Sequence, residues 1–290
     1  MTDTTLRPLG LLGIDVDGTL ITDDGHITEN VYNALDKAVS AGWEFVIASG
    51  RTYYATQSII GRLPFLNYAI LSNGACIMDV KKNQVLHLET LTPEIVRKVV
   101  QVTREQGAIP ALYNTDIFHQ AVYYDTIDGA CDFFKWYVTD DKRCERIGDI
   151  MEYTDNVLQV GMIAARDIIF SIRDGLDGSG ARVLALPFES PHFGGKNRDF
   201  WFLQVVNRQA SKLDALRKVS RWLDIPDGRL IAVGDNYNDA DMIKGADVGI
   251  AMGNAPDEIK ELAHEVVGSN NGSGLVEVVD RIVLNEAYFE

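Results

Sequence analysis

The chain has 290 residues, 46% of them hydrophobic and 24% charged, which is the composition of a folded globular protein rather than a disordered one. Its 27 Lys and Arg residues are outnumbered by 42 Asp and Glu residues, so the formal net charge is -15 and we expect neither nucleic acid nor an anionic membrane as a partner. The N-terminal segment does not resemble a signal peptide, and no apolar run approaches the ~18 residues that span a bilayer, so we expect a cytoplasmic protein.

The cysteine and histidine residues do not indicate a transition-metal site. The three cysteines are odd in number and contain no CxxC pair, so we expect Cys76, Cys131 and Cys144 to be free thiols. The five histidines are scattered without metal-ligand spacing, and we interpret them as surface or structural residues.

The first ~80 residues alternate short apolar runs with helical patterns, which is typical of a parallel sheet covered by helices. The apolar runs 11–14, 45–48 and 68–71 predict strands, and each ends in a polar turn. Between the first two strands, Thr28 can cap a helix and Gly42 follows its end. This part of the chain is therefore predicted to form a βαβ unit.

The middle of the chain, residues 82–206, has a different pattern. Thr92 and the proline after it open a predicted helix that ends before Gly107. The alternating stretches 117–124 and 199–206 predict antiparallel strands. We therefore expect an inserted α+β domain here.

The last part of the chain returns to the pattern of the first. Ser211 opens a helix through a capping-box pattern, and residues 230–233, 248–251 and 265–267 predict buried strands. The expected fold is α/β, with a Rossmann-like doubly wound parallel sheet as its core. We expect residues 1–81 and 207–290 to form this discontinuous core domain, and residues 82–206 to form the inserted α+β cap domain.

Polar side chains follow the predicted strands at the points where the strands end. In an open parallel sheet, ligands bind outside the carboxyl ends of the strands, so these side chains are expected to form one site. They are Asp15, Asp17, Ser49, Arg51, Asn73, Asp235, Asn238 and Asp239.

Carboxylates gathered at one site repel each other, and two unit charges 4 Å apart interact by about 4 kcal/mol at an effective dielectric of about 20. A hard cation is therefore required, and oxygen ligands without His or Cys nearby favour Mg²⁺. Lys212, in the first turn of its predicted helix, adds a positive charge that suits a phosphoryl group.

Each of these motifs alone has an ordinary structural explanation. The Asp-Val-Asp-Gly segment can be an acidic turn, Ser-Gly-Arg can be a surface turn, and Lys212 can be an exposed helix residue. Their joint occurrence, each at a strand or helix end, favours a functional site.

Together these motifs resemble those of the haloacid dehalogenase superfamily. The matching segments are residues 15–19, 48–51, Lys212 and 234–239, and residues 251–274 resemble the tail of the Cof-type phosphatases, which have a large type IIB cap. Leu213 stands where this family often has Gly, and Asp-Val-Asp replaces the commoner Asp-Leu-Asp or Asp-Met-Asp, but neither change removes a functional group.

The resemblance implies a Mg²⁺-dependent phosphatase that hydrolyses a small phosphomonoester, such as a sugar phosphate, through an aspartyl-phosphate intermediate. Asp15 would be the nucleophile, and Asp17 the general acid and base. The implied phosphate-binding residues are Ser49, Gly50, Arg51, Lys212 and Asn238. The implied Mg²⁺ ligands are Asp15, Asp17 through its backbone carbonyl, Asp235 and Asp239.

Two other functions stay open at this point. A sugar phosphomutase or phosphotransferase would use the same Asp15 with a sugar hydroxyl as acceptor, whereas a non-catalytic phosphometabolite-binding protein would not need nucleophile, acid and metal ligands together. Substrate choice is expected in the cap, where the loop 191–198 offers His192, Lys196 and Arg198. A monomer or small homo-oligomer is expected.

Overall fold

The computed structural model describes residues 7–190 and 195–285, and these form two compact units. The first unit comprises Met1–His87 and Ser211–Glu290, and the second comprises Leu88–Ala210. These boundaries lie a few residues later than those expected at 82 and 206. None of the described helices is both long and apolar enough to span a lipid bilayer.

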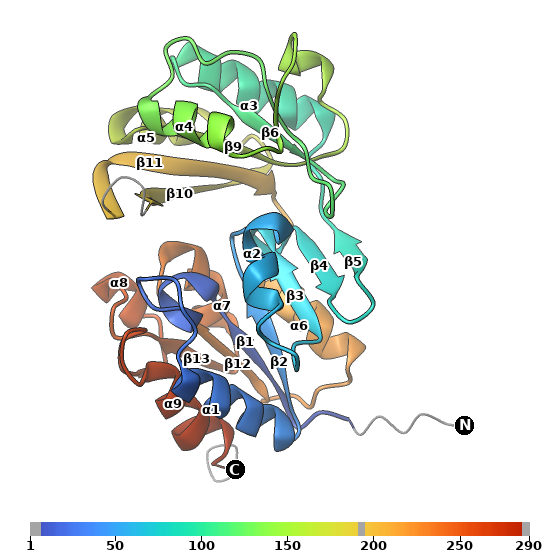
Figure 1. Cartoon of the computed structure of the whole chain (residues 1–290), viewed down its shortest axis with the longest axis vertical. Coiled ribbons are helices and arrows are strands. Elements are labelled where there is room, and N and C mark those ends of the chain that lie inside the picture. Colours follow the sequence, from blue (N-terminus) through green and yellow to red (C-terminus); the bar gives the residue numbers. More distant parts are fainter. Residues whose placement is uncertain (1–6, 191–194, 286–290) are drawn as a thin grey trace. The chain divides into compact units, whose positions relative to one another are not determined.

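The first unit is built on an eight-stranded sheet with strand order β14-β13-β12-β1-β2-β3-β4-β5 (Figure 1). Strand β1 lies between β2 and β12 and pairs with both in parallel. The parallel strands are β1 (Gly10–Ile14), β2 (Trp43–Ala48), β3 (Tyr68–Leu71), β12 (Leu230–Gly234), β13 (Val248–Ala251) and β14 (Glu265–Val266). Every residue of β1 and β12 is buried, which explains their continuous apolar sequences.

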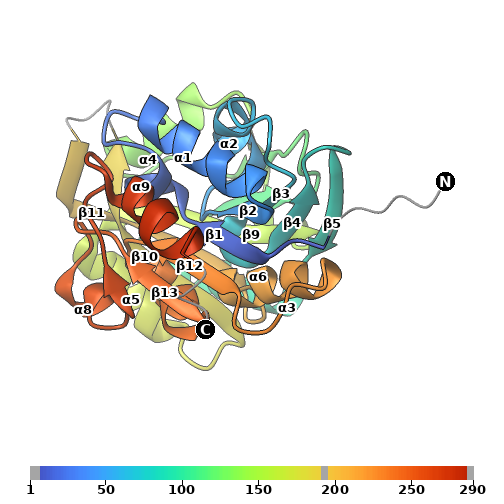
Figure 2. The ribbon, with the colours of Figure 1, turned by 90° about the horizontal axis from the view of Figure 1, so that it is seen from below.

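Helices cover both faces of this sheet, which confirms the doubly wound α/β fold. Figure 2 shows α1, α2 and α9 on one face and α6 on the other. The helices of this unit are α1 (Glu29–Ser40), α2 (Tyr53–Ile60), α6 (Lys212–Trp222), α7 (Ala240–Gly245), α8 (Asp257–Lys260) and α9 (Gly274–Val278). The predicted N-caps are present, since Thr28 accepts from the backbone N–H of Val31, and Ser211 from that of Asp214.

A buried apolar cluster fixes α6 against the sheet. Leu216 and Val219 of α6 pack with Leu11, Val46 and Ile70 from three neighbouring strands. Because α6 begins at Lys212, this packing also fixes the position of that lysine at the carboxyl edge of the sheet.

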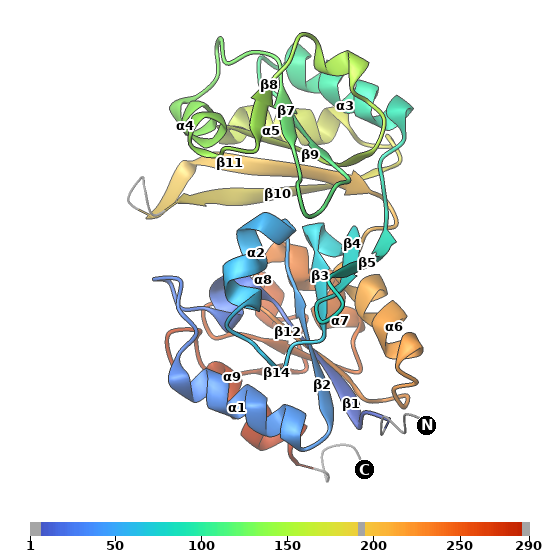
Figure 3. The same cartoon turned by 45° about the vertical axis from the view of Figure 1, so that its right-hand side comes forward.

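The sheet continues beyond the predicted strands through a hairpin. Strand β4 (Cys76–Asp79) pairs antiparallel with β3, and β5 (Gln84–Leu88) follows it at the edge of the sheet (Figure 3). Residues 84–87 therefore belong to the first unit, because their backbone hydrogen bonds are made in its sheet.

The second unit contains a six-stranded sheet of order β10-β11-β9-β6-β7-β8. Its pairs are antiparallel except for the parallel pair of β7 and β8, and β10 and β11 form a long ribbon (Figure 3). The strands are β6 (Ala111–Asn114), β7 (Val122–Tyr124), β8 (Cys144–Arg146), β9 (Val157–Ala165), β10 (Ala181–Ser190) and β11 (Gly195–Asn207). The helices are α3 (Pro93–Glu105), α4 (Asp132–Asp140) and α5 (Arg166–Gly175).

This second sheet contributes to two apolar clusters. Val160 and Met162 of β9 pack in the cluster that contains α3 and α5, whereas Ile163 packs with Phe133 and Phe134 of α4. Because successive strand residues point to opposite faces, α4 covers the face opposite to α3 and α5. The second unit therefore has its own core.

Three sequence expectations concern this unit and the three cysteines of the chain. The strand expected over 117–124 forms only at Val122–Tyr124, because the Asn114 side chain accepts hydrogen bonds from the backbone N–H groups of Asp116 and Ala121 and stabilises a turn instead. All three cysteines are free thiols, as predicted. His192 lies outside the described residues, and Lys196 and Arg198 lie in β11, where only their backbone is described.

Candidate active site

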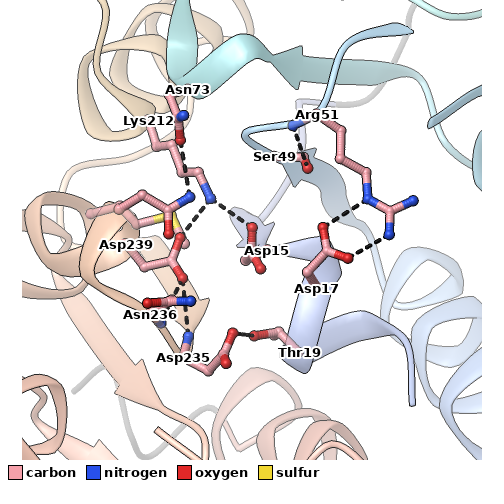
Figure 4. Close-up of polar contacts among 12 residues, drawn as sticks. Asp15, Asp17, Thr19, Ser49, Arg51, Asn73, Lys212, Asp235, Asn236 and Asp239 are labelled. Carbon is pink, nitrogen blue, oxygen red and sulfur yellow. Dashed lines mark hydrogen bonds and ion pairs between the residues drawn. The ribbon is translucent and has the colours of Figure 1, made fainter. Parts of the chain in front are cut away.

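The strand register brings the first motifs together at one edge of the core sheet. Ile14 of β1 is level with Ile47 of β2 and with Val233 of β12. Asp15, Ser49 and Asp235 follow directly or within two residues, so their side chains meet beyond the carboxyl ends of the three central strands (Figure 4).

Lys212 is the central cation of this site. Its ammonium Nζ lies 2.6 Å from Asp15 Oδ1 and 2.6 Å from Asp239 Oδ1 (Figure 4). The lysine and Asp239 are fully buried, and Asp15 is 4% exposed. Burial favours the neutral amine, but the charges of Asp15 and Asp239 outweigh it and raise the pKa of Lys212 above its ordinary value.

Three carboxylates form an acidic cluster around this lysine. One oxygen each from Asp15, Asp235 and Asp239 lie within 4.8 Å of one another. Burial, and then the charge of Asp239, raise the pKa of Asp15 well above its ordinary value and that of Asp235 to about 7. One lysine does not balance three carboxylates, so the cluster suits a hard cation such as Mg²⁺.

Asp239 differs from the other two carboxylates because both of its oxygens already have donors. Oδ1 accepts from Lys212, and Oδ2 accepts from the backbone N–H groups of Asp235, at 3.1 Å, and Asn236, at 3.0 Å. The second contact is part of a capping box that opens the short helix η5 (Tyr237–Asp239). Asp239 therefore fixes both the lysine and the loop that contains Asp235.

Asp17 points away from the acidic cluster toward Arg51 (Figure 4). The guanidinium forms a bidentate pair with this carboxylate, with Nε 2.7 Å from Oδ2 and Nη2 2.5 Å from Oδ1. The Asp17 side chain is 55% exposed, whereas those of Lys212 and Asp15 are nearly or fully buried. Arg51, which was expected to bind phosphate, is bound here to Asp17.

The loop after β2 is held by the turn η2 (Ser72–Gly74) that follows β3. The backbone N–H of Ser72 donates to the Arg51 carbonyl at 2.9 Å, and that of Asn73 donates to the Ser49 carbonyl at 3.0 Å. The Ser49 hydroxyl accepts from the backbone N–H of Arg51 at 3.1 Å. The turn η2 therefore fixes this loop through two main-chain hydrogen bonds.

Asn73 joins the loop to the late motif. Its Oδ1 accepts from the Asn238 amide at 3.0 Å, and a Cβ added to Gly50 would lie 3.0 Å from its Nδ2. Asn73 was noticed in the sequence at the end of the third strand, but its spacing alone gave it no role. Thr19 and Asn254, which sequence analysis did not assign to the site, donate to Asp235.

The predicted catalytic, phosphate-binding and metal-binding residues thus all lie in the first unit. The acidic cluster, Lys212, Ser49 and Asn238 come from both halves of this unit, which are separated in the sequence by the second unit. The Asp17 and Arg51 side chains form a separate pair beside them.

The chain is similar to known phosphatases over almost its whole length. The chain is 27% identical to the 5-amino-6-(5-phospho-D-ribitylamino)uracil phosphatase YcsE of Bacillus subtilis, over 94% of this chain and 96% of that protein. It is 22% identical to the pyridoxal phosphate phosphatase YbhA of Escherichia coli, over 93% of this chain and 97% of that protein. A solved phosphatase of the haloalkanoate superfamily from Bacteroides thetaiotaomicron has the same fold, with a TM-score of 0.76 at 21% identity over 97% of each chain.

A family model, described as haloacid dehalogenase-like hydrolase, matches residues 12–279. The match begins before Asp15 and ends beyond the last site residue, so it includes every motif described above. The resemblance that those motifs indicated is confirmed, and the chain belongs to the haloacid dehalogenase-like hydrolases.

Proposed function

We propose that this protein is a Mg²⁺-dependent phosphatase that hydrolyses a small phosphomonoester through phosphorylation of Asp15. The observation that supports this most directly is the buried Asp15 carboxylate, which lies 2.6 Å from Lys212 and within the acidic cluster. A carboxylate beside a cation and a metal-type ligand set can attack a phosphate group whose own negative charge would otherwise repel it.

The acidic cluster fits the metal by the chemistry of its donors. Asp15 and Asp235 would hold Mg²⁺ together with the backbone carbonyl of Asp17, and Asp239 would support them, since its oxygens are already engaged. When bound, Mg²⁺ supplies positive charge that offsets the negative charge of the phosphoryl oxygens.

In the first step, a carboxylate oxygen of Asp15 forms a bond to phosphorus while the bond from phosphorus to the ester oxygen breaks. The leaving alkoxide takes a proton from Asp17 and departs as an alcohol. In the second step, Asp17 accepts a proton from water, which attacks phosphorus and releases inorganic phosphate with the Asp15 carboxylate restored.

The ion pair between Asp17 and Arg51 affects both of these reaction steps. Both carboxylate oxygens of Asp17 accept from the guanidinium in this pair, which leaves no room for the proton that a general acid donates. For Asp17 to donate a proton in the first step, this pair must open. We propose that the substrate phosphate draws Arg51 away, which would also give that arginine its expected role in phosphate binding.

The remaining polar groups suit a phosphoryl pocket. Lys212 would offset the charge of one phosphoryl oxygen and keep its hydrogen bond to Asp15. Ser49 and Asn238 would donate hydrogen bonds to the other phosphoryl oxygens. Gly50 leaves room beside Asn73, because a side chain there would come within 3.0 Å of the Asn73 amide.

We also propose that the second unit is the cap and selects the substrate. The chain enters and leaves this unit once, at residues 87–88 and 210–211, and the unit has its own core. The two relatives described above act on a ribitylamino-uracil phosphate and on pyridoxal phosphate, and their sequences are 27% and 22% identical to this chain. The substrate therefore has to be found by assay.

A screen of sugar phosphates, nucleotides and phosphorylated cofactors tests the proposal. Phosphate release should require Mg²⁺, fall on addition of EDTA, and be inhibited by Ca²⁺, whose looser coordination misplaces the nucleophile. The Asp15→Asn variant, purified in parallel, should release no phosphate and serves as the control for contaminating phosphatases. Full activity after exhaustive chelation, or equal activity in Asp15→Asn, would contradict the proposal.

A further inference from the structure

Asn254 lies in the loop after β13, outside the four motifs, and its amide joins three separate segments of the first unit. Its Nδ2 donates to the Gly18 carbonyl at 2.8 Å and to Asp235 Oδ2 at 3.2 Å. Its Oδ1 accepts from the backbone N–H of Asn270 at 3.0 Å. One exposed side chain thus contacts the segment after Asp15, the acidic cluster and a distant turn.

The contact with Asp235 completes a pair of neutral donors. Asp235 Oδ1 accepts from the Thr19 hydroxyl at 3.0 Å (Figure 4), and Oδ2 accepts from Asn254. A hydroxyl and an amide orient a carboxylate without cancelling its charge, unlike the ammonium of Lys212 beside Asp15 and Asp239. Neither donor carries a positive charge that would compete with a cation for Asp235.

The loop that contains Asn254 is itself fixed from both sides. The backbone N–H of Met252 donates to the Gly234 carbonyl at 3.0 Å, next to Asp235, and that of Gly253 donates to the Gly268 carbonyl at 3.0 Å. The amide of Asn254 therefore has a defined position relative to the Asp235 carboxylate.

The turn behind Asn254 is fixed in the same way. Asn270, which is 5% exposed, donates to the Ile21 carbonyl and to Asp23 Oδ1, each at 3.0 Å. Asn271 Nδ2 donates to Asp23 Oδ2 at 2.9 Å, and its Oδ1 accepts from the backbone N–H of Asp23 at 3.0 Å. This turn connects Asn254 to the segment that follows Asp15 and Asp17.

We propose that Asn254 is a positioning residue for Asp235: its amide orients this carboxylate for Mg²⁺ and ties it to the backbone at Gly18. The inference rests on the proposed function, because it takes the acidic cluster to be the metal site. Partners of metal ligands typically contribute about 10-fold to 100-fold in metal affinity.

Direct titration with Mg²⁺ tests this, by calorimetry on the whole metal-free protein, with Mn²⁺ titration followed by electron paramagnetic resonance as a second measurement. We expect Asn254→Ala to weaken Mg²⁺ binding by about 10-fold and to raise the Mg²⁺ concentration for half-maximal activity in proportion. The matched control is Asn271→Ala, an exposed asparagine of the same network whose side-chain contacts are with Asp23. It should bind Mg²⁺ within about two-fold of the wild type, since it leaves Asp235 untouched.

Thermal unfolding of the metal-free variants shows whether both are folded. Wild-type Mg²⁺ affinity in Asn254→Ala, or an equal loss in Asn271→Ala, would overturn the inference. A wild-type protein that binds no divalent cation would overturn the inference and the proposed function together. A protein that binds Mg²⁺ but hydrolyses no phosphomonoester would contradict the proposed function alone.

Discussion

Two cations divide the acidic side chains of the site between them. Lys212 forms ion pairs with Asp15 and Asp239 in the buried part of the site, and Arg51 forms an ion pair with Asp17 in the exposed part. The two donors to Asp235 within residues 7–190 and 195–285 are neutral, and burial together with Asp239 raises the pKa of Asp235 to about 7. At the residue scale, the aspartates of the site therefore differ in their hydrogen-bond partners. Asp15 and Asp239 face an ammonium, Asp17 faces a guanidinium, and Asp235 faces a hydroxyl and an amide.

A carboxylate outside the site shows the same cost of burial in a simpler setting. Glu44 of β2 accepts from the Asn67 amide at 3.0 and 3.2 Å, yet burial raises its pKa from 4.5 to about 7. Because this folded-state pKa is raised, its contribution to stability is present below about pH 4.5 and is lost as the pH rises through about 7. The loss amounts to at most about 3 kcal/mol.

We therefore expect Glu44→Gln to be more stable than the wild type at pH 8, by about 1 to 3 kcal/mol, and to lose this advantage at pH 4.5. Urea unfolding at both pH values measures the difference. Glu261→Gln, at an exposed position, is the control and should show no such dependence. An advantage for Glu44→Gln that is equal at both pH values would contradict this account.

At the scale of elements, the sequence predicted the features that depend on neighbouring residues, such as the starts of helices. Thr28, Thr92 and Ser211 mark helix starts, and each does cap its helix. Strand β5 was missed because its residues are half exposed and its pairing depends on the distant fold of the sheet. Asn73 was expected at the site from its place after the third strand, but its partner Asn238, 165 residues away, was not predicted. The contacts of Asn254 were missed because its partners Gly18 and Asp235 lie 236 and 19 residues away.

The turn η2 links two of the motifs at this scale. It holds the Ser49 loop through two backbone hydrogen bonds and packs against the start of α6. Gly74 has a φ of +95°, and a Cβ there would lie 2.2 Å from the carbonyl oxygen of Ser211, the residue before Lys212. No side chain fits at this position without moving the helix start.

Gly74→Ala should therefore lower both stability and phosphatase activity, because it combines backbone strain with a displacement of Lys212. The matched control is Gly228→Ala, where φ is +78° but nothing lies within 4 Å of the added Cβ. We expect the control to lose about 1 to 2 kcal/mol from strain alone and to keep its activity. Denaturant unfolding and steady-state kinetics compare the two, and equal effects in both variants would count against the role of this turn.

For the whole molecule, the division into two units separates the site from the second core. Every site residue lies in Met1–His87 or Ser211–Glu290, and Leu88–Ala210 has its own sheet and apolar clusters. A ligand of the acidic cluster should therefore stabilise the first unit selectively, because a ligand stabilises only the structure to which it binds.

Amide hydrogen exchange, measured once with Mg²⁺ and once with EDTA in the buffer, tests this selectivity. Amide exchange should slow in the segments around Asp15 and Asp235 and stay unchanged in Leu88–Ala210. The Asp235→Asn variant, which lacks one ligand charge, should show a much smaller effect. Equal slowing throughout both units would mean that they respond as one body.

The mass of the enzyme quenched in acid during turnover tests the central claim most directly, namely that Asp15 is the residue that is phosphorylated. In Asp17→Asn, attack by Asp15 is retained while hydrolysis of the intermediate lacks its base, and loss of such a group typically costs about 10²-fold to 10⁴-fold. With p-nitrophenyl phosphate, whose leaving group needs little protonation, we predict that a phosphoryl adduct accumulates on Asp15 in Asp17→Asn and is absent from Asp15→Asn. An adduct on Asp17 or any other residue, or an adduct that persists in Asp15→Asn, would contradict the account.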